Sequence, residues 1–174
     1  MPTSTFPTEL AGKLWHTTNE SRFEGIGTCG YIVVEPDIPD TDRWKSAAGR
    51  EHYPYVRWIG GISLFDFSDF DPESYEAQFP LSSWRTFVPF QKTWRNSLWI
   101  EIDRAAIAPN FLSGQDVLAR RRSENAYGHD FMPNIEAACL AGIPVSAFRQ
   151  VLIRGSDSPT FRPYVRNVTT RTEA

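Results

Sequence analysis

The sequence predicts a single α+β domain over residues 1–174, and three observations support that prediction. The chain has 174 residues, which suits one ordinary domain and is short for two independent cores. Hydrophobic residues make up 41% and charged residues 22%, which is typical of globular proteins and excludes disordered or collagen-like chains. Segments typical of strands are interleaved along the chain with short segments that carry helix caps and good helix formers.

The first predicted elements are a strand and a short helix. Residues 13–17 form an apolar and β-branched segment that predicts a strand. Thr18 or Asn19 can cap the helix that follows, because short polar side chains accept hydrogen bonds from free backbone N–H groups. We expect Gly25 and Gly27 to end this helix.

Three strands and a helix are predicted in the middle of the chain. Residues 30–34 are rich in β-branched side chains, and Pro36 ends that strand. Residues 62–67 partly alternate between apolar and polar, as in a half-buried strand, and residues 69–78 look helical. Residues 97–103 form the clearest strand, because Leu, Ile and Ile recur there at every second position.

The last third of the chain predicts a helix and two strands. A serine cap and good helix formers predict a helix over residues 113–123. The arginines at residues 120–122 suit the negative end of the helix dipole, and a patch that meets phosphates of a cofactor or of nucleic acid is the alternative. Glu136 opens a late strand, and residues 150–154 predict another.

Charge and aromatic content leave two questions open. The net charge of −3 provides no global basic field to attract nucleic acid, although a local basic patch is compatible with it. Aromatic residues make up 14% of the chain, which indicates either large core side chains or a cavity with stacking walls. Composition alone does not separate these two interpretations.

Cysteine content and hydropathy predict a cytoplasmic protein. Cys29 and Cys139 are the only cysteines, too few for a disulfide framework, which favours a reducing compartment. No basic leader with an apolar segment opens the sequence, and no apolar stretch reaches the roughly 18 residues of a membrane-spanning helix. We therefore expect no secretion and no membrane span.

Several familiar catalytic motifs are absent from the sequence. There is no glycine-rich phosphate loop followed by Lys-Ser or Lys-Thr, and no Gly-x-Gly-x-x-Gly fingerprint. There is also no nucleophile elbow, no pair of closely spaced cysteines and no His-Glu-x-x-His segment. The sequence therefore predicts no catalytic metal.

Three short motifs remain, and their order along the chain is informative. Leu14-Trp15-His16-Thr17-Thr18 places a histidine at the end of the first strand, and Gly61-Ile62-Ser63-Leu64-Phe65 places a serine in a middle strand. Asn134-Ile135-Glu136, followed by Ile143-Pro144, places a glutamate at the start of a late strand. This set resembles the three motifs of the ADP-ribosyltransferase superfamily, most of all the bacterial and phage-borne toxin or defence transferases, including the DNA-modifying toxins and the RNA 2′-phosphotransferases.

The resemblance departs from the superfamily in the second motif. That motif lacks the Ser-Thr-Ser of one branch and an unambiguous tyrosine of the other. Phe65 or Phe67 would have to replace the tyrosine as the stacking ring.

The resemblance implies a fold and a reaction. The fold is a split, mostly antiparallel sheet with flanking short helices, whose central cleft takes NAD as a substrate. Nicotinamide leaves the ribose through an oxocarbenium-like state, and ADP-ribose passes to a protein or nucleic-acid acceptor. The catalytic residues are Glu136, which would stabilise the sugar cation, and His16, which would hold the ribose hydroxyls.

The resemblance also implies positioning roles for four residues. The Thr17 backbone would pair with the nicotinamide carboxamide, Ser63 would bind near the ribose, and Phe65 would close over the nicotinamide ring. Asn134, two residues before Glu136 and so on the same face of a strand, would orient the acceptor.

Other interpretations stay open. Each of His16, Ser63, Phe65 and Glu136 also has a structural interpretation as a core, rim or solvated residue. RNA 2′-phosphate transfer would need arginines in the cleft, for which Arg57 and residues 120–122 are candidates. A non-catalytic inhibitor or adaptor would use exposed Trp and Tyr residues as interface anchors. The negative net charge favours a protein acceptor, and an antitoxin or inhibitor is a conceivable partner.

Overall fold

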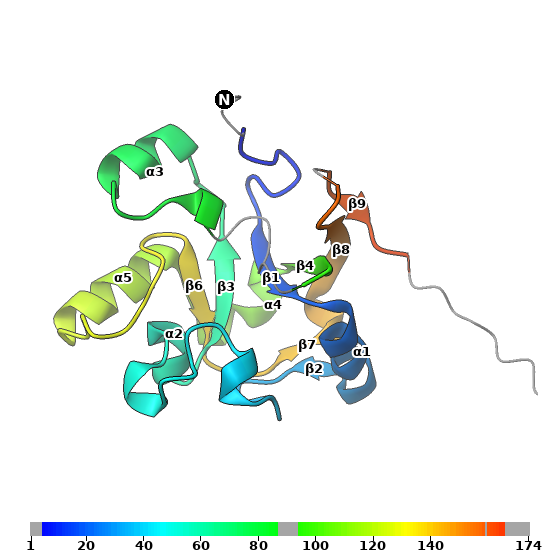
Figure 1. Ribbon diagram of the computed structural model, residues 1–174, viewed down its shortest axis with the longest axis horizontal. Coiled ribbons are helices and arrows are strands. Elements are labelled where there is room, and N and C mark those ends of the chain that lie inside the picture. Colours follow the sequence, from blue (N-terminus) through cyan, green and yellow to red (C-terminus); the bar gives the residue numbers. More distant parts are fainter. Residues whose placement is uncertain (1–4, 87–93, 159, 166–174) are drawn as a thin grey trace, which may run out of the picture.

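A seven-stranded sheet forms the centre of the molecule (Figure 1). The structure is a computed structural model that describes residues 5–86, 94–158 and 160–165. The strand order is β5-β6-β3-β1-β4-β8-β9, and all the pairs described are antiparallel. The strands are β1 (Leu14–Thr18), β3 (Ile62–Asp66), β4 (Asn96–Ile102), β5 (Phe111–Leu112), β6 (Glu136–Cys139), β8 (Phe148–Gly155) and β9 (Arg162–Pro163). The predicted α+β class with a mostly antiparallel sheet is therefore confirmed.

Short helices and a small second sheet surround this sheet. The second sheet pairs β2 (Tyr31–Ile32) with β7 (Ile143–Pro144). The α-helices are α1 (Glu20–Cys29), α2 (Tyr55–Trp58), α3 (Pro72–Gln78), α4 (Arg104–Ile107) and α5 (Gly114–Ser123). The 3-10 turns are η1 (Asp40–Asp42), η2 (Arg50–His52), η3 (Trp84–Thr86), η4 (Ala108–Asn110) and η5 (Val145–Ala147). Within the described residues, no helix is both long enough and apolar enough to cross a membrane.

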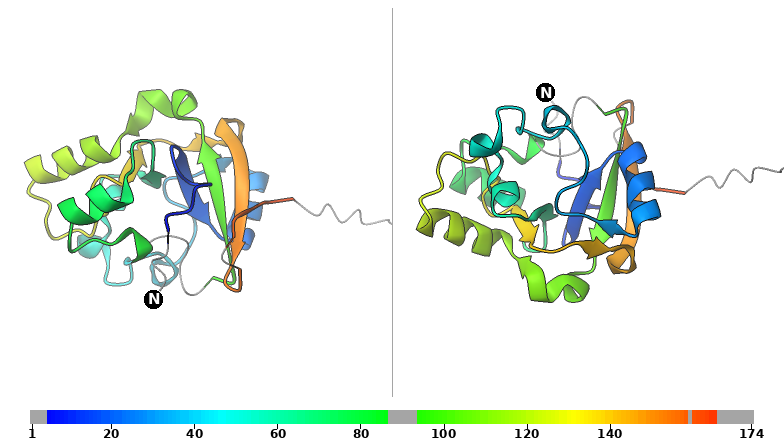
Figure 2. Two further views of the ribbon diagram at one scale, coloured as in Figure 1. Left: turned by 90° about the horizontal axis from the view of Figure 1, so that it is seen from above. Right: turned by 90° about the horizontal axis from the view of Figure 1, so that it is seen from below.

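The central sheet splits between β1 and β3. Residues Trp15 to Thr18 of β1 all pair with β4, whereas only Leu14 and Trp15 pair with β3. The two strands therefore separate after Trp15. Figure 2 shows the result: β1, β4 and β8 lie together on one side of the molecule, and β6 lies on the other.

Side chains of alternate residues pack on the two faces of the sheet, because successive residues of a strand point in opposite directions. On one face, Trp15, Phe65 and Trp99 belong to one buried cluster. On the other, Leu14 and Ile100 belong to a second cluster. Both faces are covered, so the predicted strand at residues 97–103, observed as β4, is buried on both sides.

Several predicted element boundaries are shifted, and two of these differences have a clear physical cause. Helix α1 continues through Gly25 and Gly27 and ends at Gly30, whose positive φ of 82° is the left-handed conformation that closes many helices. Strand β2 covers only Tyr31–Ile32 of the predicted residues 30–34, because its partner β7 is only two residues long. The Asn19 cap of α1 is confirmed, since its side chain accepts a hydrogen bond from Arg22 N–H at 2.9 Å.

Candidate functional site

A cavity of about 800 Å³ opens beside the split in the sheet. Helix α1, the two separating strands and the segment that follows β2 contribute to its wall. Five residues that the sequence predicts as site residues line this cavity: His16, Thr17, Ser63, Phe65 and Glu136. The structure therefore brings together residues of β1, β3 and β6 that lie as far as 120 positions apart in the sequence.

Glu136 is the buried acid of the site. It is the first residue of β6 and only 1% exposed. The Ser63 hydroxyl donates to Glu136 Oε1 at 2.7 Å, and the Met132 backbone N–H donates to Oε2 at 3.1 Å. Burial raises the pKa of Glu136 to about 7, and these two hydrogen bonds partly oppose the rise.

The register between β3 and β6 explains why Ser63 reaches Glu136. Phe65 lies directly opposite Glu136, and Ser63 lies two residues before Phe65. Since residues two apart in a strand share a face, Ser63 and Glu136 form a diagonal pair on one side of the sheet. Ser63 is exposed although it lies in a central strand, because the cavity lies over it.

His16 enters the site from the other side of the split. Its Nδ1 lies 3.2 Å from the Ser63 carbonyl oxygen. A carbonyl oxygen can only accept, so Nδ1 carries the proton and Nε2 is left as an acceptor. Burial lowers the pKa of His16 to about 4, the hydrogen bond to Ser63 opposes this effect, and Arg22 adds to it. The imidazole is therefore neutral at physiological pH.

The backbone of Thr17 faces the split. Lys13 C=O accepts a hydrogen bond from Phe67 N–H at 2.9 Å, so Lys13 directs its backbone groups toward the β3 side. In an antiparallel strand the backbone N–H and C=O groups of successive residues point to opposite neighbouring strands. The backbone groups of Trp15 and Thr17 therefore point toward the β3 side, as those of Lys13 do. Because pairing with β3 stops at Trp15, the Thr17 N–H and C=O have no strand partner on that side among the described residues. The Thr17 hydroxyl is also buried without a hydrogen-bond partner.

Phe65 forms part of the cavity wall and part of the core. It is 7% exposed, and its ring centroid lies 5.0 Å from that of Trp99 and 5.8 Å from that of Phe67. Phe67 is fully buried and is not among the residues that line the cavity. Of the two rings considered from the sequence, only Phe65 is therefore placed to touch a ligand.

Three arginines line the cavity, and two of them already have carboxylate partners. Arg43 Nη1 lies 2.5 Å from Glu35. Arg57 Nη2 lies 3.1 Å from Glu35 and 2.8 Å from Asp40. Arg22 instead donates to the carbonyl oxygen of residue 42 at 2.7 Å, and no carboxylate of the described residues lies within ion-pair distance of it. Arg22 is therefore the least neutralised cation of the cavity wall.

Only part of the predicted set of arginines reaches the cavity. Arg57 lines it, as predicted. The arginines at residues 120–122 do not, because they end helix α5, where Arg120 pairs with Glu124 at 2.8 Å. Arg22 and Arg43, which also line the cavity, were not predicted from the sequence. Arg22 follows the capping residue Asn19 by three positions, which puts it in the first turn of α1 beside His16.

The strand position predicted for Asn134 is wrong. Strand β6 begins at Glu136, and Asn134 lies in the preceding turn with a positive φ of 59°. It does not line the cavity. Its carbonyl group instead packs against Gly114, where an added Cβ would lie 2.1 Å from the Asn134 oxygen. Asn134 therefore does not share a strand face with Glu136.

Among the described residues, no three His, Cys, Asp or Glu side chains gather closely enough to hold a metal ion. Comparison with family models, with curated proteins and with solved structures finds no match for this chain.

Proposed function

We propose that the protein is an NAD-dependent ADP-ribosyltransferase that cleaves the bond between nicotinamide and ribose. The observation that carries this proposal is the convergence of His16, Ser63 and Glu136 in one cavity at the split between β1 and β3. Each comes from a different motif of the sequence. The split sheet with flanking short helices supports an ADP-ribosyltransferase-like fold.

The hydrogen-bonding groups of the cavity complement a nicotinamide riboside. Glu136, when ionised, and His16 Nε2 are both acceptors, and the two ribose hydroxyls are donors. The Thr17 N–H and C=O complement the two ends of a carboxamide. Phe65 provides an apolar wall beside them. The cavity volume of about 800 Å³ is within the range of sites that enclose small ligands.

Glu136 would supply the electrostatic part of catalysis. As the glycosidic bond breaks, the electron pair leaves with nicotinamide and positive charge grows on the ribose. A carboxylate held in place by Ser63 and Met132 stabilises that charge most strongly in the transition state, without having to reorganise. The nucleophilic atom of the acceptor then bonds to the ribose carbon and releases its proton.

The charges of the cavity favour ADP-ribosyl transfer over RNA 2′-phosphate transfer. Arg22 forms no ion pair among the described residues and is close enough to influence His16, so it would attract the pyrophosphate of NAD. Arg43 and Arg57 are already balanced by Glu35 and Asp40. The cavity therefore has one positive charge without an ion-pair partner for the diphosphate of NAD, but little further positive charge for an additional phosphate on an RNA.

A non-catalytic binding module is the less favoured interpretation. Such a module would not require Glu136, Ser63 and His16 to meet. A fully buried carboxyl group with a raised pKa also costs stability, and such groups concentrate at functional sites.

The test is the release of nicotinamide from labelled NAD. We expect the wild type and the surface control Glu73→Gln to release nicotinamide, and Glu136→Gln and His16→Ala to release far less. A binding module would give no release from any of the four proteins. An RNA 2′-phosphotransferase would consume NAD only when RNA with a 2′-phosphate is present.

A further inference from the structure

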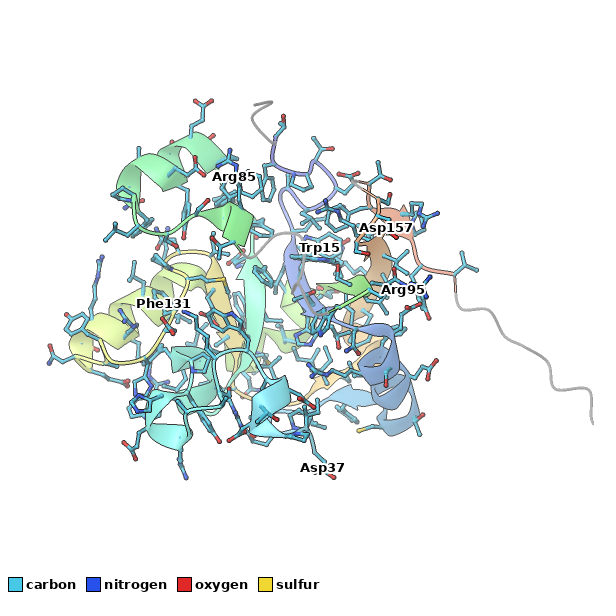
Figure 3. All side chains as sticks on the ribbon, in the orientation of Figure 1. Trp15, Asp37, Arg85, Arg95, Phe131 and Asp157 are labelled. Carbon is cyan, nitrogen blue, oxygen red and sulfur yellow. The ribbon has the colours of Figure 1, made fainter. Side chains whose placement is uncertain are left out.

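The segment between β2 and α2 forms one wall of the cavity (Figure 1). We call residues 35–53 the strap. Its residues that line the cavity include Ile38, Arg43, Trp44 and Ser46. Part of the strap lies at the edge of the molecule, where the exposed side chain of Asp37 points away from the sheet (Figure 3).

The strap has no apolar anchor of its own. Of residues 35–53 only Ser46 is buried, and none belongs to the hydrophobic clusters of the described residues. The chain on either side is anchored, because Val34 packs against one of these clusters and Tyr55 and Val56 are fully buried. A segment with so few buried apolar contacts can open locally while the core stays folded.

Polar contacts centred on Arg57 of α2 hold the strap instead. Arg57 donates to Glu35 through Nε and Nη2, both at 3.1 Å, and its Nη2 lies 2.8 Å from Asp40. Its guanidinium lies 3.6 Å from the ring centroid of Tyr53, whose hydroxyl donates to Asp40 at 2.5 Å. Arg43 adds an ion pair with Glu35 at 2.5 Å. We call these five residues the Arg57 network, and it joins the first residue of the strap to the last.

Single polar contacts also join the strap to neighbouring elements. Arg22 of α1 donates to the Asp42 carbonyl oxygen at 2.7 Å, and Lys45 pairs with Asp130 at 3.0 Å. Arg57, by contrast, contacts three residues of the strap. Arg57 is therefore the main attachment of the strap.

We propose that the strap is a movable wall of the cavity and that Arg57 is the positioning residue that holds it in place. With the Arg57 network intact, the strap keeps Ile38 and Trp44 at the cavity. When the network breaks, the strap detaches between Val34 and Tyr55, which stay packed. The motion of the strap does not depend on the proposed function, whereas its effect on NAD rests on that function.

Two properties of the Arg57 network favour its opening. Arg57 Nη1 is buried and has no hydrogen-bond partner among the described residues, a cost that water relieves when the strap moves away. The side chains of Glu35 and Asp40 are 55% and 38% exposed, so dissolved salt screens their attraction to Arg57. The strap should therefore open more readily as the ionic strength rises.

The test is limited digestion with trypsin, followed by mass spectrometry, because three tryptic bonds lie within the strap, after Arg43, Lys45 and Arg50. Cleavage of a segment that opens and closes rapidly reports the population of its open state. We expect Arg57→Gln and Glu35→Gln each to speed cleavage at these bonds by about tenfold, because each loses charge-assisted hydrogen bonds. High salt should speed cleavage of the wild type, after correction for the effect of salt on a small peptide substrate.

Arg104→Gln is the matched control. Arg104 also contacts a carboxylate, that of Asp66, and its guanidinium lies 4.6 Å from the Phe111 ring centroid, but it lies outside the strap and does not line the cavity. Cleavage within the strap should be unchanged in this variant. The effect of combining Arg57→Gln with Glu35→Gln should be smaller than the product of the two single effects, because both remove the same contact.

Equal cleavage of the strap in the wild type, Arg57→Gln and Glu35→Gln would overturn this inference. An equal increase in Arg104→Gln would also overturn it, because it would indicate a general loss of stability.

Nicotinamide release separates this inference from the proposed function. Where both hold, Glu35→Gln should raise KM for NAD several-fold and leave kcat little changed, because Ser63 still positions Glu136 and His16. Faster strap cleavage in the variants of a protein that releases no nicotinamide would contradict the catalytic proposal alone. Nicotinamide release with equal strap cleavage in all variants would contradict the strap alone.

Discussion

The hydroxyl of Ser63 donates a hydrogen bond of 2.7 Å to the carboxyl group of Glu136, across the junction of β3 and β6. The carbonyl oxygen of the same Ser63 lies 3.2 Å from His16 Nδ1. One residue thus positions both predicted catalytic side chains, through its side chain on one face of the sheet and through its backbone toward the split. Burial sets the direction of both pKa shifts, and each contact with Ser63 opposes the shift of its partner.

Activity should depend on the ionisation of Glu136. Only the carboxylate stabilises a sugar cation, and the pKa of Glu136 is raised to about 7. We therefore expect kcat/KM for nicotinamide release to increase as the pH rises through about 7. Ser63→Ala removes a hydrogen bond that lowers this pKa, so the midpoint should shift to higher pH. Ser146→Ala on the surface is the control, and an unchanged midpoint in Ser63→Ala would argue against this assignment.

Glu136→Gln should stabilise the folded protein at alkaline pH. Because the folded-state pKa is raised above the unfolded value, the favourable contribution of Glu136 is present below about pH 4.5 and is lost as the pH rises through about 7. The burial of the ionised group then costs up to about 3 kcal/mol. Denaturant unfolding should show Glu136→Gln to be more stable than the wild type at pH 8 but not at pH 5. Equal pH dependence in the two proteins would contradict the raised pKa.

His16 should remain neutral well into the acidic range. Its pKa is lowered to about 4, so the stability that it contributes is present above its ordinary value of 6.5 and is lost as the pH falls toward 4. NMR of the imidazole protons should therefore give a midpoint near 4 for His16. A midpoint near 6.5 for His16 would show that the ring is not enclosed as described.

The close contact between Gly114 and Asn134 predicts a destabilising substitution. A Cβ at position 114 would lie 2.1 Å from the Asn134 carbonyl oxygen, so Gly114→Ala must displace the turn before β6. We expect a loss of about 1–3 kcal/mol of unfolding free energy. Gly128→Ala is the control, because an added Cβ there meets no atom within 4 Å. Equal stability of the two variants would contradict this packing.

Local patterns predicted the elements that carry the site. The Ser113 cap of α5 is confirmed as a capping box with Asp116, which uses only neighbouring residues. Glu136 is confirmed as the first residue of its strand. His16 and Ser63 also lie on strands, as expected. Such features depend on residues close together in the sequence, so a single sequence can reveal them.

Other features depend on contacts that the sequence does not display. Helix α1 continues through Gly25 and Gly27 because its Asn19 cap and the packing of Phe23 and Ile26 offset the roughly 1 kcal/mol cost of each glycine. Arg43 reaches the cavity from an irregular segment whose path depends on tertiary contacts. The prediction for Asn134 extended the two-residue alternation of a strand backwards from Glu136. The strand begins at Glu136, so the alternation does not reach Asn134.

The rate constant kcat for nicotinamide release by Glu136→Gln, measured at saturating NAD with the dissociation constant for NAD determined alongside, tests the central claim most directly. The substitution keeps the shape of the side chain and removes the charge that stabilises the sugar cation. We predict that kcat falls by about 100-fold or more while the affinity for NAD changes only a few-fold. A variant that releases nicotinamide as fast as the wild type would contradict the role of Glu136.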